Sequence, residues 1–240
     1  DLSKQKRRRF LSKISVGNYD AIIIPQSQFE SIPLSLERQE AMYSRKITEV
    51  TDAINELKSK NGERMTVKTL ERQRKSMEAA IDRLRADFKK DDFITFEELG
   101  VDFLFVDEAH NYKNLALFSK MRNVAGVNTS SNSQKAFDME MKCRYLQEIN
   151  NGGGVVFATG TPISNSVSEL FVMQYYLQYE QLRQLDLDYF DNWASVFGVI
   201  TQDMEVKPSG DGFRMRTRFS QFTNIPELLN IVSEVFDIVK

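Results

Sequence analysis

Residues 103–110 read FLFVDEAH, an apolar run that passes directly into two acidic residues and a histidine. A second run of this kind, VVFATGTP at residues 155–162, follows three consecutive glycines. Short apolar runs rich in β-branched and aromatic residues are typical of buried strands. We therefore expect buried strands at 103–106 and 155–158, each ending in a polar cluster.

A third apolar run, AIII at residues 21–24, ends at Pro25 and predicts another buried strand, with a short helix leading into it. Helical patterns occupy residues 136–149 and 166–178, and the second opens with the capping-box sequence SVSE. A terminal helix is expected from residue 224 onward. Apolar strands that alternate with helices predict an α/β fold with a mostly parallel sheet flanked by helices.

Residues 35–90 follow a different pattern, in which apolar side chains recur every three or four residues on two stretches. Asn61-Gly62 lies between the two stretches and is a strong turn signal. We expect an inserted, coiled-coil-like antiparallel helical hairpin at 35–91 that projects as an arm. The alternative is that each apolar stripe packs on the core. Arg74 interrupts the second stripe and must pair or reach solvent.

The composition is that of a globular protein. The 240 residues include 32 basic and 34 acidic ones, for a net charge of −2, and 41% are hydrophobic. This excludes fully disordered and collagen-like chains. No apolar run approaches the roughly 20 residues of a membrane span, and the basic N-terminus lacks the apolar stretch of a secretory signal. The single cysteine, Cys143, and the single histidine, His110, exclude an internal disulfide and a four-ligand zinc site. We expect a cytoplasmic, reducing location.

The acidic pair after the 103–106 strand suits nucleotide hydrolysis. Ligands of open parallel sheets bind beyond the carboxyl ends of the strands. Asp107 can hold Mg²⁺ near phosphates, and Glu108 can orient and polarise a water molecule. The plainer alternative is a charge pair at the N-terminus of a helix.

The cluster after the second strand supplies hydroxyl groups. Thr159 and Thr161 can bond to the acidic pair or to His110, and Gly160 permits a tight turn. A hydroxyl-rich turn beside a phosphate site can respond to the presence of the γ-phosphate. The turn is therefore a candidate for coupling hydrolysis to movement.

The residues in this order resemble a known family. Residues 106–114, VDEAHNYKN, look like the Walker B region of superfamily 2 helicases of the DEAH-spelled Swi/Snf type. Residues 159–165, TGTPISN, resemble that family's third motif. Residues 19–27 are similar to its strand and loop that touch the nucleic-acid backbone.

This resemblance implies an incomplete RecA-like lobe that uses ATP and Mg²⁺ and acts on double-stranded DNA. It also assigns roles to individual residues. Catalysis falls to Asp107, Glu108 and His110, coupling to Thr159, Gly160 and Thr161, and nucleic-acid contact to Ser27, Gln28, Lys113 and Asn114.

Two parts of the family pattern are missing from the sequence. No G-x-x-x-x-G-K-[ST] loop is present, and no glycine is followed by lysine. The second motor lobe with its arginine finger is also missing. We expect the chain to be a piece of a longer protein, with the loop upstream of Tyr19 and the second lobe beyond Lys240. Ser164 stands where the family often has Gln, so it receives no role.

The tail has a narrower resemblance. Residues 190–195 and 219–228 resemble large helicase-like proteins of bacterial mobile elements and phages, which often carry an adenine-specific DNA methyltransferase. The chain itself contains no methyltransferase motif.

The expected organisation has four parts: the start of a RecA-like lobe at 1–34, the hairpin at 35–91, the rest of the lobe at 92–180, and an extension toward the second lobe at 181–240. The predicted function is part of an ATP-dependent DNA helicase or translocase motor, inactive as this piece alone. The alternative is a non-catalytic module that binds protein or DNA. Expected partners are DNA, the second lobe, and a protein or DNA partner of the hairpin, with no membrane.

Overall fold

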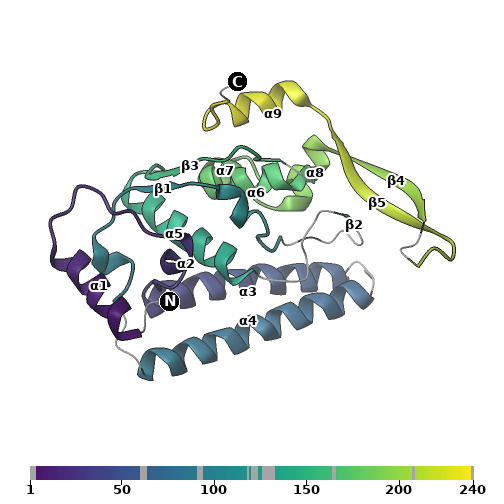
Figure 1. The fold of residues 1–240 in the computed structure, drawn as a ribbon. Coiled ribbons are helices and arrows are strands. Elements are labelled where there is room, and N and C mark those ends of the chain that lie inside the picture. Colours follow the sequence, from purple (N-terminus) through teal and green to yellow (C-terminus); the bar gives the residue numbers. More distant parts are fainter. Residues whose placement is uncertain are drawn as a thin grey trace. The chain divides into compact units, whose positions relative to one another are not determined.

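The computed structural model describes residues 4–59, 64–90, 94–117, 119, 124–125, 133–163, 166–206 and 209–238 (Figure 1). The chain forms two compact units. Residues 1–103 and 138–145 make the first unit, and residues 104–137 and 146–240 make the second. Among the described residues, no helix is both long enough and apolar enough to cross a membrane.

The first unit is helical. Its elements are α1 (Lys4–Val16), α2 (Gln26–Phe29), α3 (Leu36–Ser59), α4 (Arg64–Lys90), the 3-10 helix η1 (Glu97–Leu99) and the middle of α5 (Gln134–Ile149). Helices α3 and α4 lie side by side and run in opposite directions (Figure 1).

Both helices of the predicted pair therefore form. Val50 and Ile54 of α3 and Leu70 of α4 are buried, as the repeat of apolar positions requires. The expected turn at Asn61-Gly62 lies outside the described residues. Arg74 lies near a carboxylate, with its Nε 3.6 Å from Glu78, but the buried Nε makes no hydrogen bond within the described residues.

The first half of α3 contacts α5. The Nζ of Lys46 lies 3.1 Å from Oε1 of Glu140, which is buried on α5. The guanidinium of Arg38 lies over the ring of Tyr145, 4.8 Å from its centroid. The first half of α3 is therefore tied to α5, and the projection of the rest of the hairpin as an arm stays a prediction.

A fully buried lysine fixes α5 within this unit. The Nζ of Lys142 donates to Asp138 at 2.6 Å and to the carbonyl of Phe29 at 2.9 Å, and lies 4.2 Å from the centroid of the Phe29 ring. Burial lowers the pKa of Lys142 and raises the pKa of Asp138 to about 6. Desolvation of both charged groups therefore opposes the attraction between them.

The strand predicted at residues 21–24 does not form. The segment has no regular secondary structure, and Ile23 is 98% exposed. A strand requires a neighbour for its backbone hydrogen bonds, and no described strand pairs with this segment. The helix expected before it is present as α1, which buries Leu11 and Ile14.

The second unit contains all the strands that the structure describes. Its elements are β1 (Leu104–Val106), the 3-10 helix η2 (Ala109–Tyr112), β2 (Val124–Ala125), the ends of α5, β3 (Val155–Phe157), α6 (Ser168–Leu177), α7 (Tyr179–Gln184), α8 (Phe190–Phe197), β4 (Gly198–Val206), β5 (Phe213–Phe222) and α9 (Ile225–Val232).

Strands β1 and β3 pair in parallel, with Phe105 opposite Val156. The structure confirms a mixed α/β class that is mostly helical and has a small parallel sheet. The predicted burial of β1 is wrong in part, because Phe105 is 74% exposed and only Val106 is buried. Parallel strands are normally covered on both faces, and one face of this two-stranded sheet is not covered by described residues.

The core of the second unit is aromatic. Trp193 is fully buried, and the rings of Phe171, Phe190 and Phe197 lie 5.5, 6.3 and 5.6 Å from it. Its Nε1 donates to Oε1 of the buried Gln174 at 3.0 Å. Trp193 is thus a core residue rather than an exposed stacking platform.

The C-terminal part departs from the sequence prediction. Strands β4 and β5 form an antiparallel ribbon, with β2 pairing in parallel to β5, and this ribbon was not predicted. Helix α9 ends at Val232, so Val235 and Phe236 lie beyond it, although the terminal helix was expected to include them. Helices α5 and α6 lie where helices were predicted, at 136–149 and 166–178.

Candidate functional site

The two predicted polar clusters lie next to each other in the second unit. The backbone N–H of Ala158 donates to the carbonyl of Val106 at 2.8 Å, and the N–H of Ala109 donates to the carbonyl of Ala158 at 3.0 Å. These bonds continue the β1–β3 ladder past the strand ends. Parallel pairing therefore brings the acidic cluster after β1 beside the hydroxyl cluster after β3, as the sequence predicted.

Glu108 has an unusual backbone conformation. Its φ of 51° and ψ of 46° are left-handed, and its N–H donates to Oδ1 of Asp107 at 2.9 Å. A residue with a Cβ adopts this region at a cost of about 1–2 kcal/mol. The turn directs the chain from β1 into η2, and the side chains of both acidic residues are exposed.

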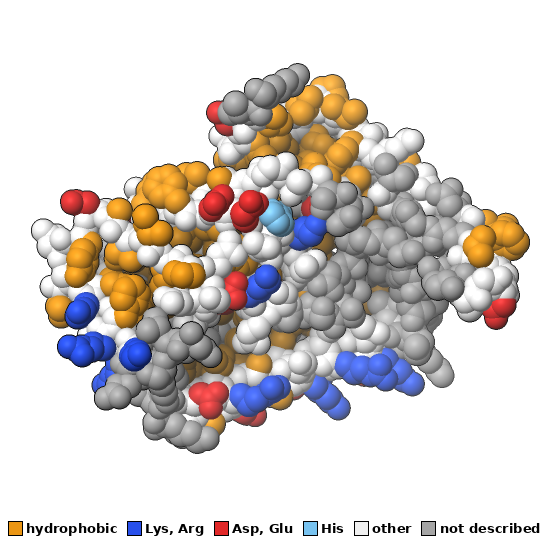
Figure 2. All heavy atoms as spheres, in the orientation of Figure 1, with side chains coloured by type: hydrophobic (Ala, Val, Ile, Leu, Met, Phe, Trp, Pro, Cys, Tyr) orange, Lys and Arg blue, Asp and Glu red, His pale blue; other side chains and the backbone are white. Residues whose placement is uncertain are grey.

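His110 connects the two clusters. Its Nδ1 lies 3.1 Å from Oε2 of Glu108 and 3.1 Å from Oγ1 of Thr159. Thr159 Oγ1 also accepts a hydrogen bond from the N–H of Thr161 at 3.1 Å. Figure 2 shows the single histidine, in pale blue, among acidic and basic side chains on one face of the molecule. A proton on Nδ1 can be donated to Glu108 or Thr159, whereas an unprotonated Nδ1 can accept from Thr159.

Lys113 forms an ion pair within the chain. Its Nζ lies 3.0 Å from Oε1 of Glu169 at the start of α6, and the side chains are 19% and 9% exposed. The predicted contact of Lys113 with nucleic acid stays a prediction, but this pair gives the side chain a defined place in the fold. Helix α6 begins at Ser168, whose N–H donates to Ser166 Oγ at 3.3 Å, so Ser166 of the predicted capping box accepts a bond at the start of this helix.

Buried contacts hold η2 in place. Ala109 and Tyr112 are fully buried, and the hydroxyl of Tyr176 lies 3.0 Å from the Tyr112 carbonyl and 2.9 Å from the Ala136 carbonyl. Sequence reasoning did not identify Tyr176, or Glu169 as the partner of Lys113. No local spacing could have indicated them, because their partners are distant in the chain.

The other predicted residues have less defined surroundings. Asn114 is exposed after η2, and Gly160 lies in the turn after β3. A Cβ added at Gly160 would meet nothing within 4 Å, and its φ is not left-handed. Ser27 and Gln28 lie on α2 in the first unit, and their contact with nucleic acid stays a prediction.

The donor set suits only one mode of Mg²⁺ binding. Among the described residues, no three His, Cys, Asp or Glu side chains converge in a way that could hold a metal ion. Mg²⁺ beside a nucleotide takes one or two carboxylates and fills its other positions with phosphate oxygens and water. The exposed carboxylate of Asp107 suits that mode, and the described residues do not form a cage built by protein alone.

Comparison with known proteins gives the family. Residues 1–239 match the family described as "Probable helicase domain", and the chain belongs to this family. The chain is also similar to Defense against restriction protein B of Escherichia phage P1, with 25% identity over 209 residues. This match covers 84% of the chain and 9% of the phage protein, so the chain spans a small part of that relative's length. No solved structure matches the chain.

Proposed function

We propose that this helicase-family chain supplies the water-activating and coupling residues of an ATP-dependent motor that moves along double-stranded DNA. The observation that carries the proposal is the position of His110, 3.1 Å from both Glu108 and Thr159. The imidazole of His110 therefore connects Glu108, which can activate water, with the turn at Thr159, which can respond to bound phosphate.

Each residue has a distinct part in this mechanism. Glu108 orients the attacking water and accepts its proton as the bond from the water oxygen to the γ-phosphorus forms and the bond to the bridging oxygen breaks, which releases ADP. Asp107 would hold Mg²⁺, which neutralises phosphate charge when bound. Thr159 shares His110 with Glu108, so movement of the turn at Gly160 changes the hydrogen bond that positions the Glu108 carboxylate.

The exposure of apolar side chains on the β1–β3 sheet supports an incomplete RecA-like lobe of the DEAH-spelled Swi/Snf type. Phe105 is 74% and Val156 41% exposed on neighbouring strands. Further strands and helices of a RecA-like lobe would cover such a face. The activity is therefore proposed for a longer polypeptide that also carries the phosphate loop and the second lobe. We propose that the 240-residue chain alone does not hydrolyse ATP.

The test is nucleic-acid-stimulated ATP hydrolysis by the longer polypeptide. Glu108→Gln should retain nucleotide binding and lower turnover by about 10²–10⁴-fold, because it removes the base and keeps the shape. Asp107→Asn should weaken binding of Mg²⁺–nucleotide. Glu227→Gln, an exposed change on α9, is the control and should have no effect.

Two outcomes would contradict the proposal. Turnover of Glu108→Gln near that of the wild type would remove the catalytic role from this residue. Absence of stimulated hydrolysis in a polypeptide that carries a phosphate loop would favour the non-catalytic binding module.

A further inference from the structure

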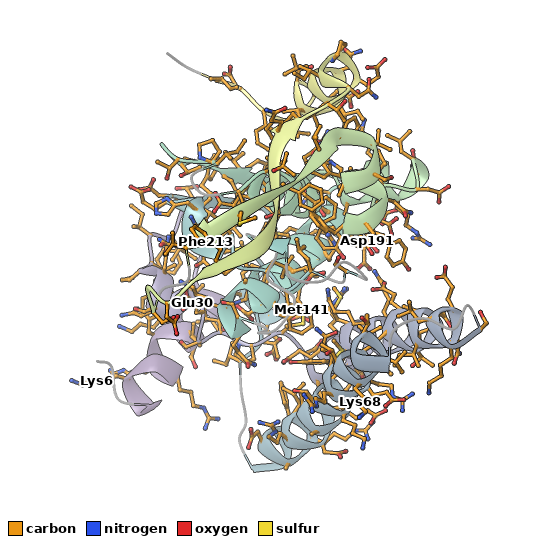
Figure 3. All side chains as sticks on the ribbon, turned by 90° about the vertical axis from the view of Figure 1, so that its right-hand side faces the viewer. Lys6, Glu30, Lys68, Met141, Asp191 and Phe213 are labelled. Atoms are coloured by element: carbon orange, nitrogen blue, oxygen red, sulfur yellow. The ribbon has the colours of Figure 1, made fainter. Side chains whose placement is uncertain are left out.

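Helix α4 has one buried face and one basic face. Val67 and Leu70 are buried, whereas Lys68, Arg72 and Lys75 are exposed. Spacings of four and three residues place these three cations on one side of the helix, away from the buried positions. Figure 2 shows Lys and Arg side chains along the lower edge over α4, and Figure 3 labels Lys68 there. We call Lys68, Arg72 and Lys75 the basic face.

The carboxylates of the helical pair neutralise this face only in part. Several of them are paired with other cations: Glu71 with Lys58 at 2.9 Å, Glu78 with Arg74 at 3.6 Å and Glu40 with Arg85 at 2.6 Å. Within the described residues, the three cations of the basic face form no ion pair. Glu71 interacts electrostatically with Lys75 and offsets part of this charge, so the exposed positive charge of the face lies mainly at Lys68 and Arg72.

We propose that the basic face of α4 binds the phosphodiester backbone of double-stranded nucleic acid. Lys68 and Lys75 lie about 10 Å apart along the helix axis, at roughly 1.5 Å per residue. Phosphates recur about every 3.4 Å along one strand, so this length of helix follows about three of them. Ala79 continues the face with a small side chain and permits close approach. Asp82 lies further along the same side and limits the contact to the first half of α4.

The composition of the face favours phosphate over a protein partner. Interfaces with proteins contain an apolar centre, yet no large apolar side chain of α4 is exposed among the residues that the structure describes. Lysine and arginine without apolar neighbours are the usual means of binding phosphate without reading sequence.

This inference rests on the proposed function only in taking nucleic acid as the partner. It requires no ATP hydrolysis, and it assigns nucleic-acid contact to a helix outside the motifs of the resemblance. Binding through this face would hold the motor on DNA independently of the nucleotide state.

The test measures the salt dependence of duplex binding by the 240-residue chain without nucleotide. Fluorescence anisotropy with a labelled duplex of about 30 base pairs is recorded between about 50 and 200 mM salt. Lys68→Gln/Arg72→Gln should lower the slope of log affinity against log salt by about 1.8, at about 0.9 for each phosphate contact. The wild type should therefore lose about tenfold more duplex affinity than the variant as the salt concentration rises from about 50 to 200 mM.

The control removes the same charge from paired side chains. Arg85→Gln/Arg183→Gln changes two arginines that already pair with Glu40 and Glu180, and should leave the slope nearly unchanged. Circular dichroism of both double variants should match the wild type, because all four positions are exposed.

Three results would overturn the inference: no duplex binding by the wild type, an unchanged slope in Lys68→Gln/Arg72→Gln, or equally good competition by poly-glutamate of the same total charge. The last result would indicate an acidic protein partner instead. Glu108→Gln should abolish ATP hydrolysis and keep the salt slope of the wild type in duplex binding. The two proposals can therefore be refuted independently.

Discussion

Replacing Lys113 by methionine should destabilise the second unit by about 3 kcal/mol. The change leaves Glu169 charged, 9% exposed and without the ammonium group that lies 3.0 Å from it. Removal of one partner from a fully buried pair costs about 3–5 kcal/mol, and the 19% exposure of Lys113 places this pair at the lower end. The melting temperature should fall by roughly 6–12 °C for a unit of this size.

Trp193 provides the assay. It is the only tryptophan of the chain and is fully buried in the same unit, so its fluorescence during urea unfolding reports on that unit. Glu169→Gln should cost less than Lys113→Met, because the amide oxygen still accepts from the ammonium group. Lys113→Met/Glu169→Leu should recover most of the loss, because an apolar pair can replace a buried ion pair.

An exposed pair supplies the control. Arg183 and Glu180 lie 3.8 Å apart with about two thirds of each side chain exposed, so Arg183→Met should change stability by less than about 0.5 kcal/mol. Equal stability of Lys113→Met and wild type would refute the reasoning. If that variant instead lost about one unit of salt slope in duplex binding, Lys113 would be the nucleic-acid contact that the family resemblance implies.

Three further predictions concern other parts of the chain. Gly160→Ala should change stability by less than about 0.5 kcal/mol, since an added Cβ meets open space, yet lower stimulated ATP turnover of the longer polypeptide about tenfold or more by crowding bound phosphate. Gln174→Leu should destabilise the second unit by about 1–3 kcal/mol in urea unfolding, because it leaves the Trp193 N–H without its acceptor. Burial raises the pKa of Asp138 from 3.8 to about 6, against the opposing effect of Lys142, so the stability that protonation of Asp138 contributes is fully present below pH 3.8 and is lost as the pH rises through 6. Relative to Asp138→Asn, the wild type should therefore gain stability as pH falls from 6 to 4, by at most about 1.4 kcal/mol per pH unit, measured by hydrogen exchange of α3.

Local patterns were sufficient to predict the elements around the candidate site. The apolar runs at 103–106 and 155–158 contain β1 and β3, and the polar residues after them meet because parallel strands end at one edge of a sheet. The apolar residues that recur every three or four positions in residues 35–90 predicted α3 and α4, because this periodicity can be read from the sequence without knowledge of tertiary contacts.

The errors arise where structure depends on distant residues. The apolar run at 21–24 indicates a preference for burial, but it carries no information about a neighbouring strand, and Ile23 is exposed. The strand β5 was missed although Arg alternates with Phe, Met and Thr from Phe213 to Phe219, a period of two that indicates a strand. The partner of Lys113 could not be predicted because sequence does not show which buried carboxylate lies near an ammonium group.

The conformation of Glu108 links the fold to the chemistry. A left-handed position favours glycine or asparagine, and glutamate there costs about 1–2 kcal/mol. Burial of Ala109 and Tyr112 offsets this conformational cost, because it holds η2 in place directly after the turn. Stability alone would select a different residue at position 108, so the carboxylate requires another explanation. Its position 3.1 Å from His110, which also reaches Thr159, provides one: the strained turn holds the Glu108 carboxylate where the imidazole can connect it to the segment after β3.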